Sequence, residues 1–94
     1  MLQPESAPKF PPGRVVITDH ADEELSREDV PRALERHLRG DWGDLEAPNQ
    51  RENERALLQG CRLLSAYCSH AGVRFWILTE PDRSATTVML PEDY

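Results

Sequence analysis

The last third of the chain consists of three short runs in which apolar and polar side chains alternate. The runs cover residues 61–69, 73–80 and 85–90, and they are rich in β-branched and aromatic residues. A period of two is typical of strands that bury one face, and the connections at 69–72 and 81–84 contain turn-forming Ser, Gly, Pro and Asp. The pattern therefore predicts a three-stranded antiparallel meander.

Alternation also divides the side chains of this predicted meander between two faces. If each connection holds an even number of residues, the apolar face lies under helices and carries Leu64, Ala66, Cys68, Val73, Phe75, Ile77, Val88 and Leu90. The opposite face then carries Ser65, Tyr67, Arg74, Trp76, Glu80, Thr87 and Met89. We expect Arg62 on the core side, level with Thr79 and Thr86, and we expect Arg83 to tie down the turn at 81–84.

The first two thirds of the chain predict one strand and three helical elements. Residues 14–18 are β-branched and bounded by Gly13, so they predict a strand, and residues 21–25 predict a brief helical turn capped by Thr18 or Asp19. A second helix is expected from residue 28 or 29 to Gly40, with His37 at the core boundary. A third is expected from Asn49 to about residue 60, with the amide of Asn53 buried and bonded to the loop before it.

These elements define the fold class. We expect an α+β protein in which an antiparallel sheet of three to four strands packs on two to three short helices, in the order β-α-α-α-β-β-β. Four of the chain's eight prolines fall within residues 1–13, which predicts an irregular arm, and residues 14–94 are expected to form a single domain.

The sequence GDWGD at 40–44 connects the second and third predicted helices. Its glycines allow tight bends, and its aspartates can accept backbone N–H bonds within the turn. We expect Trp42 to fold back over the edge of the core. The alternative is a recognition loop that presents the Trp42 ring to a partner.

Composition excludes several classes of function. The chain has 94 residues and a net charge of −6, and its eleven basic residues are scattered, so a general nucleic-acid-binding surface is not expected. No run is long and apolar enough for a membrane span and no leader peptide is visible, which predicts a soluble, cytoplasmic protein with no membrane partner. Cys61 and Cys68 are expected to be unpaired thiols that serve packing.

Neither a cofactor nor a metal is expected from the motifs. The five glycines form no phosphate-binding pattern. The three histidines lack paired spacing, and Cys68 with His70 would supply only two ligands.

Two kinds of site remain, both centred on the face expected to be open, with Trp42 beside it and His37 at its edge. The first is a protein-binding surface made of Trp42, Ser65, Tyr67, Arg74, Trp76 and Thr87, and the acidic composition favours a protein partner. The second is a metal-independent ribonuclease, because the element order is similar in outline to small toxins of the RelE and barnase-like group. Its catalytic set would be Tyr67, Arg74, His37 and Glu80.

Two further hypotheses rest on less. An acidic inhibitor that mimics DNA is suggested by charge alone, and an exposed edge strand would allow pairing with a second copy of the chain.

Three segments of the chain resemble a small family of bacterial proteins described as plasmid-related. They are RHLRGDWGDL, RLLSAY and FWILTEPDRSATTVMLPEDY, and the resemblance covers residues 14–94. It implies a bacterial, mobile-element setting and carries no established activity to any residue. Some members bear the label of a type I restriction–modification subunit.

Overall fold

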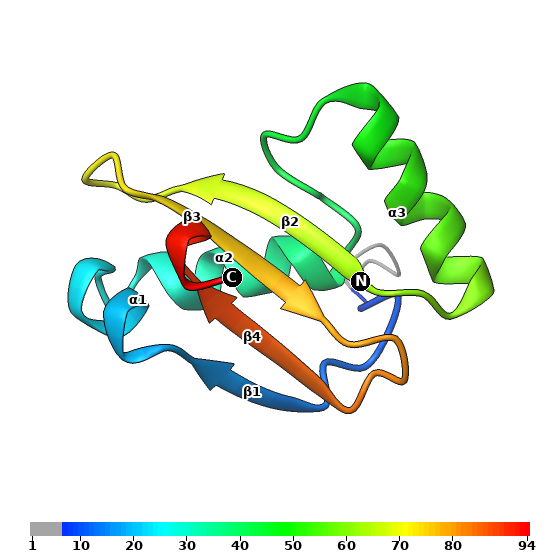
Figure 1. Cartoon of the computed structure of the whole chain (residues 1–94), viewed down its shortest axis with the longest axis horizontal. Helices are drawn as coiled ribbons and strands as arrows, with labels where there is room; N and C mark the ends of the chain where they lie inside the picture. The colour runs from blue at the N-terminus through cyan, green and yellow to red at the C-terminus, as the bar shows by residue number, and fades with distance from the viewer. Residues whose placement is uncertain (1–6) are drawn as a thin grey trace, which may run out of the picture.

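A computed structural model describes residues 7–94 and shows a four-stranded sheet with three helices (Figure 1). Across the sheet the strand order is β1-β4-β3-β2. The elements in chain order are β1 (Arg14–Ile17), α1 (Asp19–Glu24), α2 (Asp29–Leu38), α3 (Ala47–Gln59), β2 (Leu63–Cys68), β3 (Arg74–Thr79), β4 (Ala85–Met89) and the short 3-10 helix η2 (Pro91–Asp93).

The predicted fold class and element order are confirmed. The meander β2-β3-β4 is antiparallel, whereas β1 joins the free side of β4 in parallel, so the sheet is mixed. Three helices separate β1 from β2, and this long excursion lets β1 pair with the last strand of the chain instead of its nearest neighbour in sequence.

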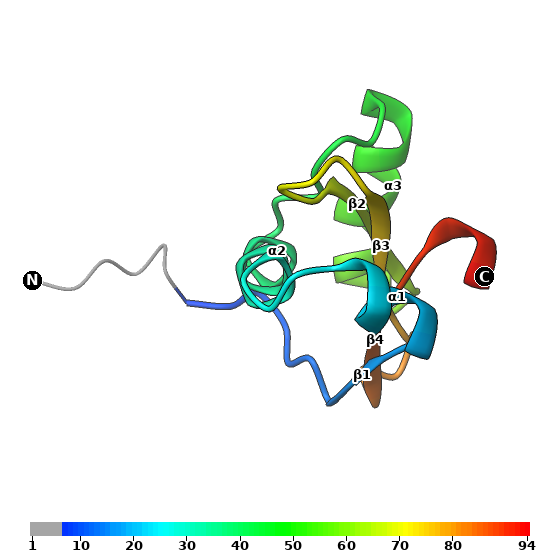
Figure 2. The same ribbon diagram turned by 90° about the vertical axis from the view of Figure 1, so that its left-hand side faces the viewer.

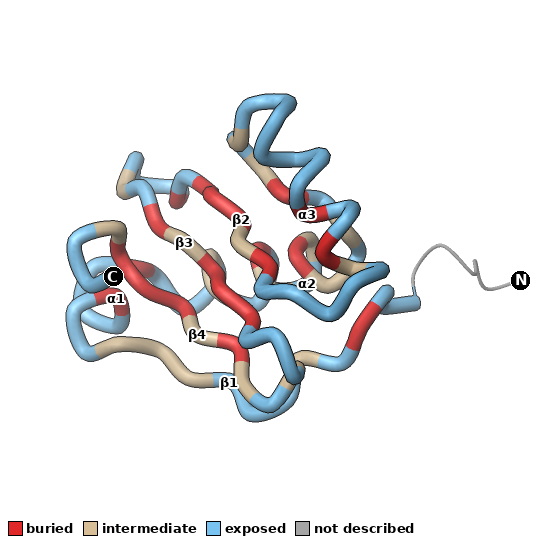
Figure 3. Tube along the Cα trace, turned by 45° about the vertical axis from the view of Figure 1, so that its right-hand side comes forward, coloured by how far each residue is buried: buried red, intermediate tan, exposed pale blue. Residues whose placement is uncertain are grey.

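Helical cover lies mainly on one side of the sheet, which we call the inner face. Figure 2 shows α2 on one side of the sheet and η2 on the other, and α3 runs beside the β2 edge (Figures 1 and 2). The main core cluster joins Phe75, Ile77 and Val88 of the sheet to Ala21 of α1 and Ala33 of α2. Burial is concentrated along β2, β3 and β4 and is lower along β1 (Figure 3).

The predicted facing of the β2 side chains is wrong by one residue. Cys68 pairs with Arg74, so five residues at 69–73 connect the strands, and this odd number reverses the facing expected for an even one. The inner face of β2 consequently carries Leu63, Ser65 and Tyr67, while Leu64, Ala66 and Cys68 lie on the opposite side, the outer face.

The same shift moves Arg62 away from its predicted place on the core side. Leu63 pairs with Thr79, and Thr79 pairs with Thr86, so Leu63 is the residue level with the two threonines. The prediction for Arg83 agrees with the structure: its guanidinium donates to the carbonyls of Glu80 and Pro81 in the turn.

Helix α3 begins two residues before the predicted cap at Asn49, with Glu46 as its N-cap and a proline in its first turn. Asn53 is buried as predicted, but its partner differs. Its amide donates to the carbonyl oxygen of Leu64 at 2.7 Å and accepts from the Leu64 N–H at 3.2 Å, which ties α3 to β2.

The connector at 40–44 covers the edge of β2 that does not pair with β3. The N–H of Ala66 donates to the carbonyl of Trp42, and the N–H of Asp44 donates to the carbonyl of Ala66. Gly43 has a φ of +77° and approaches β2 so closely that a Cβ would overlap the carbonyl oxygen of Ala66. The opposite edge of the sheet is β1, where Val15 is 45% exposed.

Part of the predicted arm packs against the domain. Phe10 is buried beside Trp42 and Leu63, and the N–H of Lys9 donates to the carbonyl of Leu38. Residues 1–6 of that arm lie outside the described residues. Among the helices of residues 7–94, none has the length and apolar character that crossing a membrane requires.

Candidate functional site

The inner face contains a line of four hydrogen-bonded, buried polar side chains, of which the sequence placed Thr79 and Thr86 level with each other on the core side. His37, Ser65, Thr79 and Thr86 all have no exposed surface. The Nδ1 atom of His37 lies 2.5 Å from the Ser65 hydroxyl, and its Nε2 lies 2.9 Å from the Thr79 hydroxyl. Each hydroxyl is therefore held by a group on another element.

The proton positions in this line follow from its far end. Thr86 donates to the carbonyl of Pro12 at 2.7 Å and also lies 2.8 Å from the Thr79 hydroxyl. Because the only Thr86 proton goes to that carbonyl, Thr79 must donate to Thr86, and His37 must donate to Thr79 from Nε2. Burial lowers the pKa of His37 to about 4, so the imidazole is neutral near pH 7, and its bare Nδ1 then accepts from Ser65.

Besides burial of the ring, the nearby Arg83 guanidinium lowers the pKa of His37. The rings of Phe10 and Trp42 meet the imidazole edge to face, at centroid distances of 5.3 and 5.7 Å. A substrate cannot reach this neutral, enclosed histidine or the serine beside it. The line of hydrogen-bonded side chains from Ser65 to Thr86 therefore stabilises the core.

The structure does not bring the four residues of the predicted ribonuclease set together. His37 and Tyr67 are buried on the inner face, whereas Arg74 is exposed at the start of β3 on the outer face. Glu80 is exposed just beyond the other end of β3. The set was assembled from the wrong facing of β2, which put Tyr67 beside Arg74.

Three of the six predicted binding residues are interior. Ser65 belongs to the line of buried polar side chains, and Trp42 is 3% exposed with its indole Nε1 donating to Glu54 at 2.8 Å. Tyr67 is also 3% exposed, donates its hydroxyl to the carbonyl of Asp41, and lies under the Arg36 guanidinium. Burial raises the pKa of Tyr67 to about 12, so its hydroxyl stays protonated. None of the three presents a surface to a partner.

The other three predicted binding residues share the outer face. Arg74 is exposed, and Trp76 and Thr87 are half-buried. Thr87 and Trp76 lie among apolar neighbours in two rows across the strands, and Arg74 pairs with Cys68 beyond them. The first row is Val16, Thr87, Leu78 and Leu64, and the second is Met89, Trp76 and Ala66. This face thus combines an apolar centre with a large aromatic side chain.

The segment that follows β4 crosses this centre. The Tyr94 ring meets the Trp76 ring at a centroid distance of 5.8 Å and an angle of 67°, and the Arg62 guanidinium lies 5.4 Å from the Tyr94 ring. Arg62 also donates to the Tyr94 hydroxyl. Tyr94 is nevertheless 66% exposed, so its ring covers the outer face only in part.

Helix η2 fixes the start of that crossing. The carboxylate of Asp93 accepts hydrogen bonds from the Thr18 hydroxyl and from the backbone N–H of Leu90, and it lies 3.1 Å from Nδ1 of His20. These bonds lower the pKa of Asp93, the largest effect being the Leu90 N–H, and they raise the pKa of His20. The position of η2 is therefore set by β1 and α1.

Sequence reasoning missed Arg62 and Tyr94 as members of this surface. Arg62 was misplaced by the facing error. Tyr94 carried no local signal, because its contacts are with β3 and with the residue before β2, far away in the sequence. Only the turn after β4 brings it back over the sheet.

Three arginines lie on the outer face: Arg14 and Arg74 within strands, and Arg62 directly before β2. Across residues 7–94, no carboxylate lies within 4.0 Å of any of these guanidiniums. Extending the strand register places Glu80 level with Arg62. The outer face of this acidic chain therefore carries arginines that have no ion-pair partner among residues 7–94.

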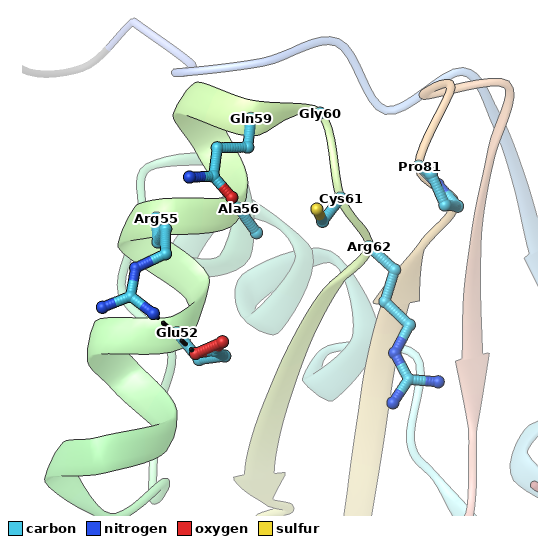
Figure 4. A pocket seen from close by; sticks show the side chains of 8 residues that line it. All are labelled: Glu52, Arg55, Ala56, Gln59, Gly60, Cys61, Arg62 and Pro81. Atoms are coloured by element: carbon cyan, nitrogen blue, oxygen red, sulfur yellow. Dashed lines mark ion pairs between the residues drawn. The ribbon is translucent and has the colours of Figure 1, made fainter.

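A hollow of about 460 Å³ adjoins Arg62 at the carboxyl end of α3 (Figure 4). Its rim contains an ion pair between Arg55 and Glu52 at 3.5 Å and the exposed Cys61. The remaining lining residues are Ala56, Gln59, Gly60, Arg62 and Pro81. Cys61 and Cys68 are both exposed, so the expectation that they serve packing is wrong.

The described residues contain no group of three or more His, Cys, Asp or Glu side chains arranged to hold a metal ion. A scan against protein-family models found no model that matches the chain. Searches of curated proteins and of solved structures likewise found no match.

Proposed function

We propose that this chain is a protein-binding or accessory module that engages its partner through the outer face of the sheet. The observation that carries the proposal is Trp76, a half-buried aromatic at the centre of the sheet face opposite α2. Trp, Tyr and Arg are the residue types that contribute most to protein interfaces, and Trp76, Tyr94 and Arg62 lie in contact there.

The arrangement of chemistry favours binding over catalysis. Side chains able to act as acid, base and phosphate clamp are divided between the two faces, with the histidine of that set enclosed. The outer face instead carries the half-buried Trp76 and Leu64 with exposed guanidiniums around them, which suits a partner surface with an apolar core and a polar rim. We place this module in the cytoplasm, in the bacterial, mobile-element setting implied by the sequence resemblance.

Site-specific photo-cross-linking tests this proposal directly. Arg74 and Arg32 are both exposed arginines, but Arg74 lies on the outer face and Arg32 lies on α2. Replacing each in turn with p-benzoylphenylalanine gives matched probes on opposite sides of the sheet. Proteins cross-linked in cells of the source organism would be identified by mass spectrometry, purified and mixed with the wild-type chain.

The expected result is a partner cross-linked from position 74 and not from position 32. The purified partner should then form a complex of fixed stoichiometry that Trp76→Ala weakens at least ten-fold without unfolding the chain. Cross-links only from position 32, or a complex indifferent to Trp76→Ala, would refute the outer face as the binding surface.

A further inference from the structure

We infer that the partner contacts the outer face with an acidic segment carrying an aromatic side chain, and that this side chain takes the place of Tyr94 on Trp76 and Arg62. The inference rests on the proposed function and names the chemistry of the partner. It combines two observations: the contacts of the Tyr94 ring, and the arginines that have no carboxylate within 4.0 Å in residues 7–94.

Tyr94 shows what the centre of the outer face accepts. One ring simultaneously meets the Trp76 ring edge to face, lies under the Arg62 guanidinium and accepts a hydrogen bond from it. A phenol supplies all three contacts, because it has a π face, a positive ring edge and an oxygen acceptor. Because Tyr94 is 66% exposed, an incoming ring can reach Trp76 and Arg62 by displacing it.

The arginines set the charge of the incoming segment. Arg62 and Arg74 stand toward opposite ends of the β2–β3 pair, six register positions apart along β3, which corresponds to roughly 20 Å at about 3.3 Å per residue. Guanidiniums bind carboxylates through paired, charge-assisted hydrogen bonds. An extended segment of about seven residues with an acid at each end and a ring near its middle would therefore satisfy both arginines and Trp76.

Acids already present on this side favour a peptide over a nucleic acid. Glu80 lies level with Arg62, and Glu92 is exposed on η2. A nucleic-acid strand carries a charge at every nucleotide and would set phosphates against these carboxylates. A peptide carries carboxylates only where its sequence places them, so it brings fewer negative charges close to Glu80 and Glu92.

Peptide titration of the whole chain tests this inference. The probe is the fluorescently labelled peptide Glu-Ser-Ser-Tyr-Ser-Ser-Glu, compared with one in which alanine replaces its tyrosine and one in which lysines replace both glutamates. A labelled oligouridine of ten nucleotides is the nucleic-acid arm. Binding would be followed by fluorescence anisotropy at 0.05 and 0.5 M NaCl.

The decisive variant is Tyr94→Ala, which removes the ring that contacts Trp76 and Arg62 in the free chain. Its ring is mostly exposed, so the variant should stay folded, and circular dichroism checks this. We expect it to bind the acidic tyrosine peptide about five- to ten-fold more tightly than the wild type does, the gain expected from removing one aromatic and one cation–π contact in competition. Arg62→Gln should weaken that binding, and high salt should weaken it further.

No measurable binding of the acidic tyrosine peptide, equal binding of the alanine or the lysine peptide, tighter binding of oligouridine, or peptide binding by Tyr94→Ala no tighter than that by the wild type would each overturn the inference. The cross-linking experiment separates this failure from failure of the proposed function. A partner cross-linked from position 74 that binds wild type and Tyr94→Ala equally would leave the outer face as the binding surface and refute the acidic aromatic segment.

Discussion

Replacing Thr86 with valine tests the line of buried hydrogen bonds that joins Ser65, His37, Thr79 and Thr86. Valine keeps the shape of threonine but removes the hydroxyl that donates to the Pro12 carbonyl and accepts from Thr79. The Thr79 proton is then left without a partner in a fully buried site. Because Pro12 is only half-buried, its carbonyl recovers part of its loss from water.

The size of the effect follows from these two losses. An unsatisfied buried donor costs about 1–3 kcal/mol, and a partly hydrated carbonyl adds less, so Thr86→Val should lower the free energy of unfolding by about 2–3 kcal/mol. A chain of this length is typically stable by about 5–14 kcal/mol. The corresponding fall in Tm is on the order of 10 °C.

Thr87 supplies the matched control for this experiment. It is the next residue along β4, its side chain faces the outer side, and its hydroxyl makes no hydrogen bond to any residue in 7–94. Thr87→Val should therefore change the free energy of unfolding by less than about 0.5 kcal/mol. Urea unfolding followed by circular dichroism compares the two variants. Equal stability of Thr86→Val and Thr87→Val would refute the deduced hydrogen bonds from Thr79 to Thr86 and from Thr86 to Pro12.

The remaining predictions concern pH, a close backbone approach and a buried phenol. The pKa of His37 is about 4 in the folded chain and about 6.5 in the unfolded chain, so the unfolded chain binds more protons between these pH values. The free energy of unfolding should therefore fall by up to about 3 kcal/mol as the pH drops from 6.5 towards 4. Urea titrations at several pH values should show a flatter pH dependence for His37→Gln, and an unchanged slope would contradict the assigned pKa. Gly43→Ala should destabilise the chain by several kcal/mol because a Cβ would overlap the β2 backbone, whereas at Gly72, with a similar positive φ but open space, alanine should cost only about 1–2 kcal/mol in the same assay. Tyr67→Phe should cost about 1 kcal/mol in thermal unfolding, since it leaves the Asp41 carbonyl without its donor, and no loss would show that water replaces the phenol.

The order of the elements could be predicted because each element has a clear local signal. Alternating runs after residue 61 identify the meander, and glycines with positive φ end two of the helical segments, Gly40 after α2 and Gly60 after α3. The parallel pairing of β1 with β4 had no such signal. This pairing depends on how the three helices between β1 and β2 position the strands that follow them, which is a property of the whole fold.

The facing of β2 could not be predicted from its own residues. The sequence LLSAYC offers apolar side chains to both faces, Leu63 and Tyr67 to one and Leu64 and Ala66 to the other. Pairing of the buried hydroxyls resolves the choice, since Ser65 on the inner face reaches His37. Sequence alone predicts an outward-facing side chain for Ser65, because its histidine partner lies on another element.

The candidate surface was predicted in part for the same reason. Arg74, Trp76 and Thr87 lie on β3 and β4, whose register agrees with the expected facing, and these three share the outer face. Ser65 and Tyr67 lie on β2 and were lost from the surface with its reversal. Trp42 followed the interpretation as a plug over the core edge, held by Glu54.

The two indole N–H groups of this chain give the most direct test of the outer face as the partner surface. Trp76 is half-buried on that face, and Trp42 is enclosed with its N–H donated to Glu54. In a ¹H–¹⁵N correlation spectrum of the labelled chain mixed with the purified cross-linked partner, the Trp76 indole signal should shift or broaden while the Trp42 signal stays in place. A complex that forms without moving the Trp76 signal would contradict the account.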